Sequence, residues 1–91
     1  MRIQVNEFQQ SFFIYHNEFE GAYINGHLTW GGEVFFVYVP EEHRRKGVAK
    51  QLAKAALKLF RERGMDNPSI TSAISPEGKE FIKWFKSEVK K

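Results

Sequence analysis

Three consecutive cations beside a glycine are the clearest chemical signal in this sequence. Arg44, Arg45 and Lys46 precede Gly47, and an amphipathic stretch begins directly after the glycine. The pattern predicts a helix from near Val48 to the glycine at position 64. A helix N-terminus presents unpaired backbone N–H groups and a partial positive charge. With cations beside it, the segment predicts a site for a ligand that carries phosphate, and a pyrophosphate in particular.

The strand before the cations is expected to position them. Residues 34–39 form a β run, and a short charged loop connects this run to the helix. Because the run is apolar on both faces after Glu33, we expect a central strand and not an edge. Strict alternation would put Glu33, Phe35, Val37 and Val39 on one face of it.

The rest of the chain predicts a β-meander followed by a strand-helix-strand-helix unit. Asn25-Gly26 is a strong signal for a two-residue turn, so residues 27–30 are expected as a further strand or as a bulged continuation. The fold class is therefore α+β, with a mixed sheet and helices packed on it, in one domain over residues 1–91. The other expected elements are strands at 10–15, 21–24 and 69–74, and a second helix at 76–88 with Ser75 as its cap.

Charge is distributed unevenly along the chain, although the net charge is only +3. Residues 1–42 contain one basic residue, Arg2, against six acidic ones, whereas residues 43–63 contain eight basic residues against Glu62 alone. Such a local positive field attracts phosphates, on a small ligand or on nucleic acid.

Several classes of protein are not expected. There is no cysteine, which excludes thiol chemistry and fits a cytoplasmic protein. The longest apolar run is too short to span a bilayer, and no signal-peptide pattern begins the chain, so no membrane association is expected. His16, His27 and His43 lack metal-ligand spacing, so we expect surface or turn histidines and no metal.

With strand, cations and helix in this order, the sequence resembles the GCN5-related N-acetyltransferase (GNAT) superfamily. The family motif is Gln/Arg-x-x-Gly-x-Gly/Ala at a helix start after a central strand, and Arg44-x-x-Gly47-x-Ala49 fits it. The resemblance covers roughly residues 10–88. It describes a short member that lacks the usual first helices and last strands.

The resemblance implies acetyl-CoA as a substrate. Backbone N–H groups of residues 44–49 would hold its pyrophosphate, and main-chain groups of the central strand would pair with the pantetheine arm. The implied cofactor-binding residues are Val37, Val39, Arg44, Arg45, Lys46, Gly47, Val48, Ala49 and Lys50.

The resemblance also implies catalytic residues. Glu33 lies six residues before Val39, the spacing at which histone-acetylating members carry a general-base glutamate. The alternative is that Glu33 begins the strand in solvent. The usual tyrosine that protonates the leaving thiolate aligns with Phe85, which has no proton to give. Tyr38 is then the first candidate for the acid, with Ser75 and water as alternatives.

The implied function is N-acetylation of a primary amine, with a protein lysine or protein N-terminus among the acceptors. One alternative is a weak or inactive CoA-binding or protein-interaction module on the same fold. Another is a small basic nucleic-acid-binding protein that uses Lys50, Lys54 and Lys58, although a solvated helix face is the simpler interpretation and specific nucleic-acid binding is not expected. The chain is expected as a monomer or homodimer.

Overall fold

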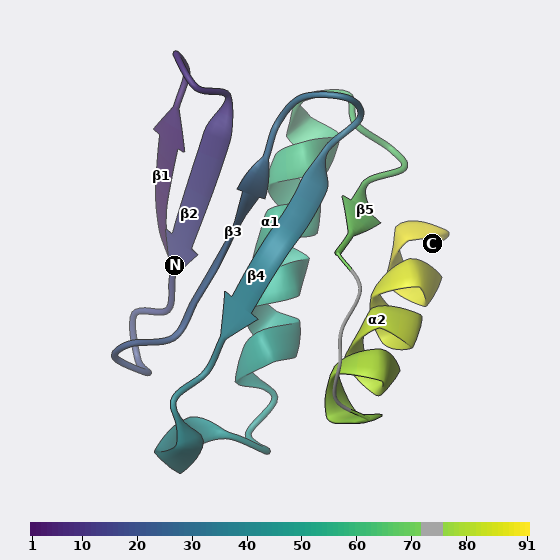
Figure 1. The fold of residues 1–91 in the computed structure, drawn as a ribbon. Helices are drawn as coiled ribbons and strands as arrows, with labels where there is room; N and C mark the ends of the chain where they lie inside the picture. The colour runs from purple at the N-terminus through teal and green to yellow at the C-terminus, as the bar shows by residue number, and fades with distance from the viewer. Residues whose placement is uncertain (72–75) are drawn as a thin grey trace.

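Four antiparallel strands occupy the first part of the chain, as the meander predicts. In the computed structural model, which describes residues 1–71 and 76–91, each strand lies beside the next in chain order (Figure 1). The strands are β1 (Arg2–Asn6), β2 (Ser11–Tyr15), β3 (Tyr23–His27) and β4 (Glu33–Tyr38). The sequence had not predicted β1.

The second half supplies two helices and a parallel strand. Helix α1 (Val48–Glu62) follows a short 3-10 turn, η1 (Glu41–His43), and Gly64 beyond its end has a φ of +77°, as expected of a C-terminal glycine. β5 (Ser69–Ile70) pairs with β4 in parallel, which confirms the mixed sheet. Helix α2 (Pro76–Val89) follows. Ser75, its predicted cap, and the end of the predicted 69–74 strand lie outside the described residues.

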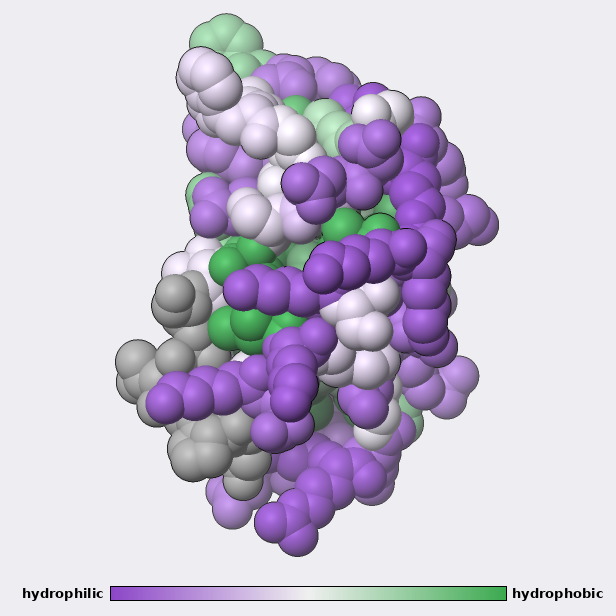
Figure 2. Space-filling view, turned by 90° about the vertical axis from the view of Figure 1, so that its right-hand side faces the viewer, coloured by the Kyte–Doolittle hydropathy of each residue, from purple (hydrophilic) through white to green (hydrophobic). Residues whose placement is uncertain are grey.

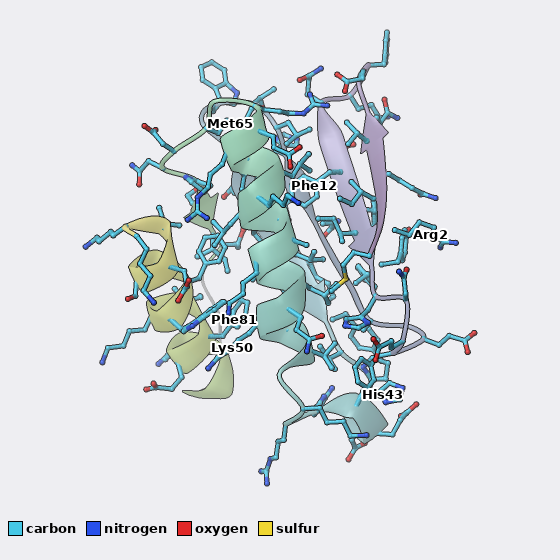
Figure 3. The ribbon with its side chains drawn as sticks, turned by 180° about the vertical axis from the view of Figure 1, so that it is seen from behind. Arg2, Phe12, His43, Lys50, Met65 and Phe81 are labelled. Carbon is cyan, nitrogen blue, oxygen red and sulfur yellow. The ribbon has the colours of Figure 1, made fainter. Side chains whose placement is uncertain are left out.

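The core lies between the sheet and α1. Phe12, Ile14, Ile24 and Val34 point from the strands toward the helix, and each is at most 1% exposed. Phe12 meets Phe60 of α1 edge-on, with ring centroids 5.4 Å apart. The buried residues of α1 are Val48, Leu52, Ala53, Ala56, Leu57, Leu59 and Phe60. α2 lies beside α1 and β5 and contributes Phe85 to this core (Figures 1 and 3).

A β-bulge in β4 overturns two predictions from the sequence. Asn25 pairs with Phe36 and Gly26 pairs with Val34, so Phe35 is an extra residue without a partner. β3 therefore runs through Asn25-Gly26, so the turn predicted there is wrong. The strand ends at His27, so the further strand or bulged continuation predicted over residues 27–30 does not extend beyond His27. The bulge also resets the alternation. Val37 pairs with buried Ile24 on the core face, while Glu33, Phe36 and Tyr38 pair with residues on the opposite face.

That opposite face, called here the outer face, is rich in aromatic rings, and no described helix covers it. Tyr23 lies 5.9 to 6.2 Å from four other rings, measured between centroids. These four rings belong to Phe13, Tyr15, Phe36 and Tyr38.

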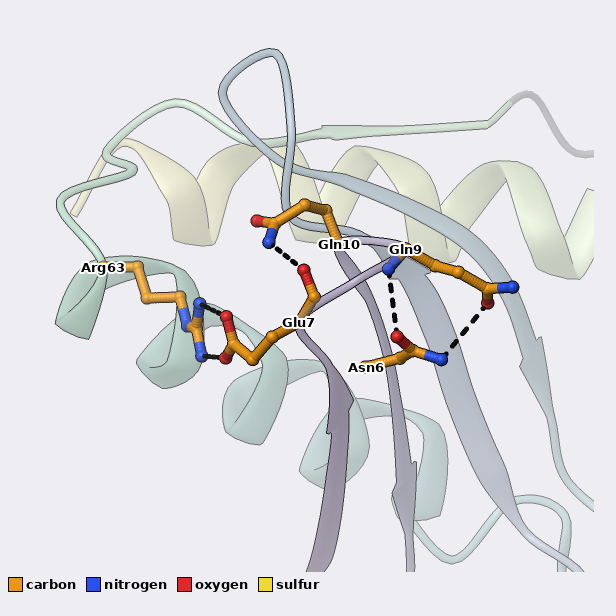
Figure 4. Close-up of polar contacts among 5 residues, drawn as sticks. All are labelled: Asn6, Glu7, Gln9, Gln10 and Arg63. Carbon is orange, nitrogen blue, oxygen red and sulfur yellow. Dashed lines mark hydrogen bonds and ion pairs between the residues drawn. The ribbon is translucent and has the colours of Figure 1, made fainter.

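An ion pair fixes the β1–β2 turn to the end of α1 (Figure 4). Both oxygens of the Glu7 carboxylate accept hydrogen bonds from the Arg63 guanidinium. Nη2 donates to Oε1, and Nη1 donates to Oε2 over 3.4 Å. This hydrogen bonding lowers the pKa of Glu7 below its ordinary value. The contact is exposed, so it orients the turn more than it stabilises the fold.

Candidate functional site

Residues 39–47 connect β4 to α1 and include the turn η1. The Arg44 side chain turns back, and its Nε donates a hydrogen bond of 3.0 Å to the Val39 carbonyl. Arg45 and Gly47 both have positive φ angles, +64° and +75°. Because only glycine adopts this conformation without strain, Gly47 is the residue that lets the loop enter the helix here.

The start of α1 offers hydrogen-bond donors to a ligand. The first bond of the helix runs from the Gln51 N–H to the Gly47 carbonyl, 3.0 Å away. The N–H groups of Val48, Ala49 and Lys50 precede that bond, so they are free of the helical ladder. Apart from its chain neighbours, a Cβ built on Gly47 would meet no atom of the described structure within 4 Å. Donors, open space and adjacent cations together fit a phosphate group.

A cleft runs from the end of β4 past this loop to α2. Its volume is about 1370 Å³, which exceeds the roughly 300–1,000 Å³ of pockets for compact ligands and suits an elongated one. Polar side chains cross the apolar strip that is visible on the α2 side (Figure 2). The cleft is lined by Phe36, Val37, Tyr38, Val39, Glu41, His43, Arg44, Arg45, Gly47, Val48, Ala49, Lys50, Gly78, Glu80, Phe81 and Trp84.

Most of the predicted cofactor residues therefore meet in one place. Lys46 is the exception, because its ammonium lies 5.8 Å from the centroid of the Phe19 ring. Val48 is only 2% exposed, so it contributes main chain to the cleft and its side chain to the core. Lys50 extends toward α2, with its ammonium 5.4 Å from the Trp84 ring centroid. In Figure 3 it lies beside Phe81.

On one side of β4 lies the parallel strand β5. The described part of β5 pairs with β4 only at Glu33 and Val34, and the last contact is a 3.0 Å bond from the Thr71 N–H to the Val34 carbonyl. Strand residues direct their main-chain groups alternately to the two sides. Counting through the bulge, Val37 and Val39 direct theirs to the same side as Val34.

Glu33 lies at the other end of β4 from the loop. It is half-buried on the outer face, where it pairs with His27 across the strands, and it does not line the cleft. Tyr38 does line the cleft and is 40% exposed. The structure thus separates the two predicted catalytic side chains by most of the length of the strand.

Helix α2 contributes apolar rings to the cleft. Phe85, aligned with the usual tyrosine, is 0% exposed and belongs to the core. Phe81 and Trp84 line the cleft instead, and their ring centroids are 5.7 Å apart. Both rings also pack against the core. Their aromatic character on an amphipathic helix fits either role, so no sequence signal separates the two.

His43 is a further cleft residue to which the sequence gave no role. Its ring lies 5.1 Å from that of Phe19, between centroids, and its Nδ1 is buried without a hydrogen-bond partner in the described structure. The His16 ring also contacts Phe19, with 4.8 Å between the two ring centroids. These ring contacts hold the 16–22 loop against the loop that carries the cations.

The described residues contain neither a membrane-spanning helix nor a metal-binding group. None of their helices has the length and apolar character needed to cross a membrane. Within residues 1–71 and 76–91, no group of three or more histidine and carboxylate side chains is placed to hold a metal ion.

Comparison with known proteins gives one match. The family model of the acetyltransferase (GNAT) family matches residues 6–83, which include β2, β3, β4, the loop with the three cations, α1, β5 and the first part of α2. No curated protein and no solved structure matches the chain.

Proposed function

Because the chain belongs to the GNAT acetyltransferase family, we propose that it is an acetyl-CoA-dependent N-acetyltransferase that acts on a primary amine. A lysine or the N-terminus of a protein is the acceptor we favour. The supporting observation is the start of α1, where three backbone N–H groups, the open space at Gly47 and the adjacent arginines meet the needs of a pyrophosphate.

The main chain at the end of β4 is the second support for acetyl-CoA. Val37 and Val39 line the cleft, and their main-chain groups face the side of β4 on which the described part of β5 pairs only at Glu33 and Val34. An extended pantetheine arm would bind there as an added strand does. Acetyl-CoA supplies the acyl group as a thioester, and the N–H groups of this segment would stabilise negative charge on its carbonyl oxygen.

Proton transfers would be divided between the two ends of β4. Glu33 would accept a proton from the acceptor ammonium, through a water where the distance requires one. Tyr38, which lines the cleft, would return a proton to the departing thiolate. Both side chains are on the outer face, so the amine would approach from the side opposite α1.

Titration with CoA tests the proposal. A ligand at a hundredfold over Kd should stabilise the fold by about 2.7 kcal/mol, which a thermal melt detects. Gly47→Asn and Gly47→Asp form a matched pair, because both residues tolerate a positive φ and both would fill the open space. We expect both variants to bind CoA more weakly than the parent protein does. The aspartate variant should bind CoA most weakly, because its negative charge repels phosphate. A melt of the parent protein that millimolar CoA leaves unmoved would refute the proposal.

A specific observation supports a second candidate, a CoA-binding module with weak or no catalysis. Within the described residues, α2 brings Gly78, Glu80, Phe81 and Trp84 to the cleft but no hydroxyl group. Turnover on a panel of amines separates the candidates. CoA binding without acetylation of any amine would favour the module.

A further inference from the structure

The centre of the outer face contains a polar group that lacks a partner. Asn25 is half-buried on β3, and its Oδ1 is buried without a hydrogen-bond partner among the described residues. A buried acceptor without a donor is costly, and rotation of the amide would bring the oxygen to the surface to meet one.

Aromatic rings surround this amide on four sides. Phe13 and Phe36 are its direct partners on the neighbouring strands, and Tyr23 and His27 are its neighbours two residues along β3. We call these five residues the Asn25 patch. Tyr23 joins the rings, because its centroid lies 5.9 Å from that of Phe13 and 6.0 Å from that of Phe36. Ring faces and an amide oxygen are the groups that attract a cation.

The charges around the patch favour a cation at one end. Glu33 pairs with His27 at the edge of the patch. Arg2 lies at the far end of the sheet, where its guanidinium carbon is 4.8 Å from the centroid of the Tyr15 ring. Residues 1–42, which form β1 to β4, are mostly acidic. Residues 43–63, which include the three cations before α1, are mostly basic. A cation is thus attracted to the Asn25 patch and CoA to the loop.

The patch also adjoins the cleft. Phe36 belongs to both, and Tyr38, which contacts Tyr23 at 5.9 Å between centroids, lines the cleft as well. A group bound over the patch would therefore lie beside the end of β4 that lines the cleft. A ligand on the patch would therefore be close to the cleft in which we propose that acetyl-CoA binds.

We propose that the Asn25 patch binds the ammonium group of a lysine side chain on a protein or peptide, with the Asn25 amide oxygen as its acceptor and the rings of Tyr23 and Phe36 around its stem. The inference rests on the proposed acetyltransferase function and names its acceptor. A lysine fits better than a neutral apolar group, because only a donor satisfies Oδ1. It fits better than a phosphate, because Glu33 would repel one.

Nuclear magnetic resonance of the full-length ¹⁵N-labelled chain tests the proposal directly. Nα-acetyl-lysine methylamide is the probe, and Nα-acetyl-norleucine methylamide, which has the same stem without the ammonium, is its control. We expect saturable shifts of the Asn25 side-chain amide with the lysine probe alone. Equal shifts with both probes, or lysine-dependent shifts only at other residues, would overturn the proposal.

Variants separate the amide from the rings. Asn25→Leu should weaken binding of the lysine probe about tenfold, the loss expected for one hydrogen bond to a charged group. Tyr23→Leu keeps an apolar side chain but removes the π face, and should weaken binding as well. Phe8→Leu is the control, because Phe8 is 97% exposed in the β1–β2 turn, away from the patch. Unchanged binding in both patch variants would contradict the proposal.

Kinetics distinguish this inference from the function on which it rests. In Asn25→Leu, KM for a lysine peptide should rise while KM for acetyl-CoA and kcat change little. If CoA binds and lysine is acetylated without any loss in the patch variants, only the inference fails. If CoA does not bind, the proposed function fails, whatever the lysine probe does. A dimer that forms through the patch and excludes the probe would assign the face to a second copy and overturn the proposal.

Discussion

Glu33 is the side chain on which the proposed chemistry depends most. Glu33→Gln should lower kcat by roughly 10²–10⁴-fold at neutral pH, because the amide cannot accept a proton. CoA affinity should persist, since Glu33 does not line the cleft. Steady-state kinetics and a CoA titration on the same preparation measure both effects. The rate of the parent protein should rise with pH, because a carboxylate base and a neutral amine are both deprotonated forms.

Glu20→Gln provides the matched control for this substitution. Glu20 is exposed in the β2–β3 connection, so its loss changes the charge of the same half of the chain without touching β4. Normal turnover in Glu33→Gln would show that water or another group is the base, and that Glu33 only begins the strand.

The position of the proton donor is the second question at this scale. Sequence alignment places it at Phe85, but that ring is wholly buried, whereas Phe81 lines the cleft four residues earlier on α2. Phe85→Tyr should destabilise the fold by about 1–3 kcal/mol through an unpaired hydroxyl, without any gain in rate. Phe81→Tyr should leave stability nearly unchanged and raise kcat if the missing acid limits turnover. Thermal melts and kinetics of the two variants test this, and a faster Phe85→Tyr enzyme would show that the side chain reaches the cleft.

At the scale of elements, the sequence predicts the long periodic segments well. The bounds of α1 follow from its apolar stripe and its two flanking glycines, and the parallel pairing of β4 with β5 follows from the strand-helix-strand order. β1 was missed because its residues are mostly exposed and its pattern is short. The bulge was missed for a different reason. Phe35 is a good strand former, and only the pairing with β3 shows that it is extra.

Gly26 shows how one local signal can have two causes. Asn-Gly favours a hairpin turn, yet here the glycine is required because β4 approaches closely at the bulge. A Cβ on Gly26 would lie 2.0 Å from the Glu33 carbonyl oxygen and 3.0 Å from a Phe12 ring carbon. Gly26→Ala should therefore destabilise the fold by at least about 1–3 kcal/mol and displace Glu33, so that kcat falls more than CoA affinity.

Gly31→Ala is the control for this prediction in the same hairpin. Gly31 has a φ of +85°, but a Cβ there would meet nothing within 4 Å, so alanine reports only the conformational cost of about 1–2 kcal/mol. Chemical denaturation of both variants measures the difference. Equal losses would mean that crowding at the bulge relaxes freely.

For the whole molecule, the uneven distribution of charge was the part of the site most accessible from the sequence. Counting residues located the basic half and the acidic half, and the fold places them at the loop and on the sheet. The Asn25 patch was not accessible in this way. Its members come from β2, β3 and β4, and they become neighbours only through the register of the sheet.

The fold also divides the lysines of α1 between two roles. Lys50 lines the cleft over Trp84, whereas Lys54 and Lys58 are exposed farther along the helix and do not line it. Lys50→Gln should weaken CoA binding, because it removes a cation beside the phosphate site. The double variant Lys54→Gln with Lys58→Gln should leave it nearly unchanged, since exposed charges beyond the cleft are screened by salt. CoA titration at two ionic strengths measures both effects.

The same double variant tests whether the exposed face of α1 that carries Lys54 and Lys58, called here the lysine face, binds nucleic acid. Binding that depends on phosphate contacts weakens steeply with salt, and each lost contact lowers that slope. We expect no specific binding of a short DNA duplex to the parent protein at about 150 mM salt, because lysines that contact only phosphates carry no sequence information. A duplex that binds with a steep salt dependence, which flattens in the double variant, would show that the face is an interface and that the basic half serves two ligands.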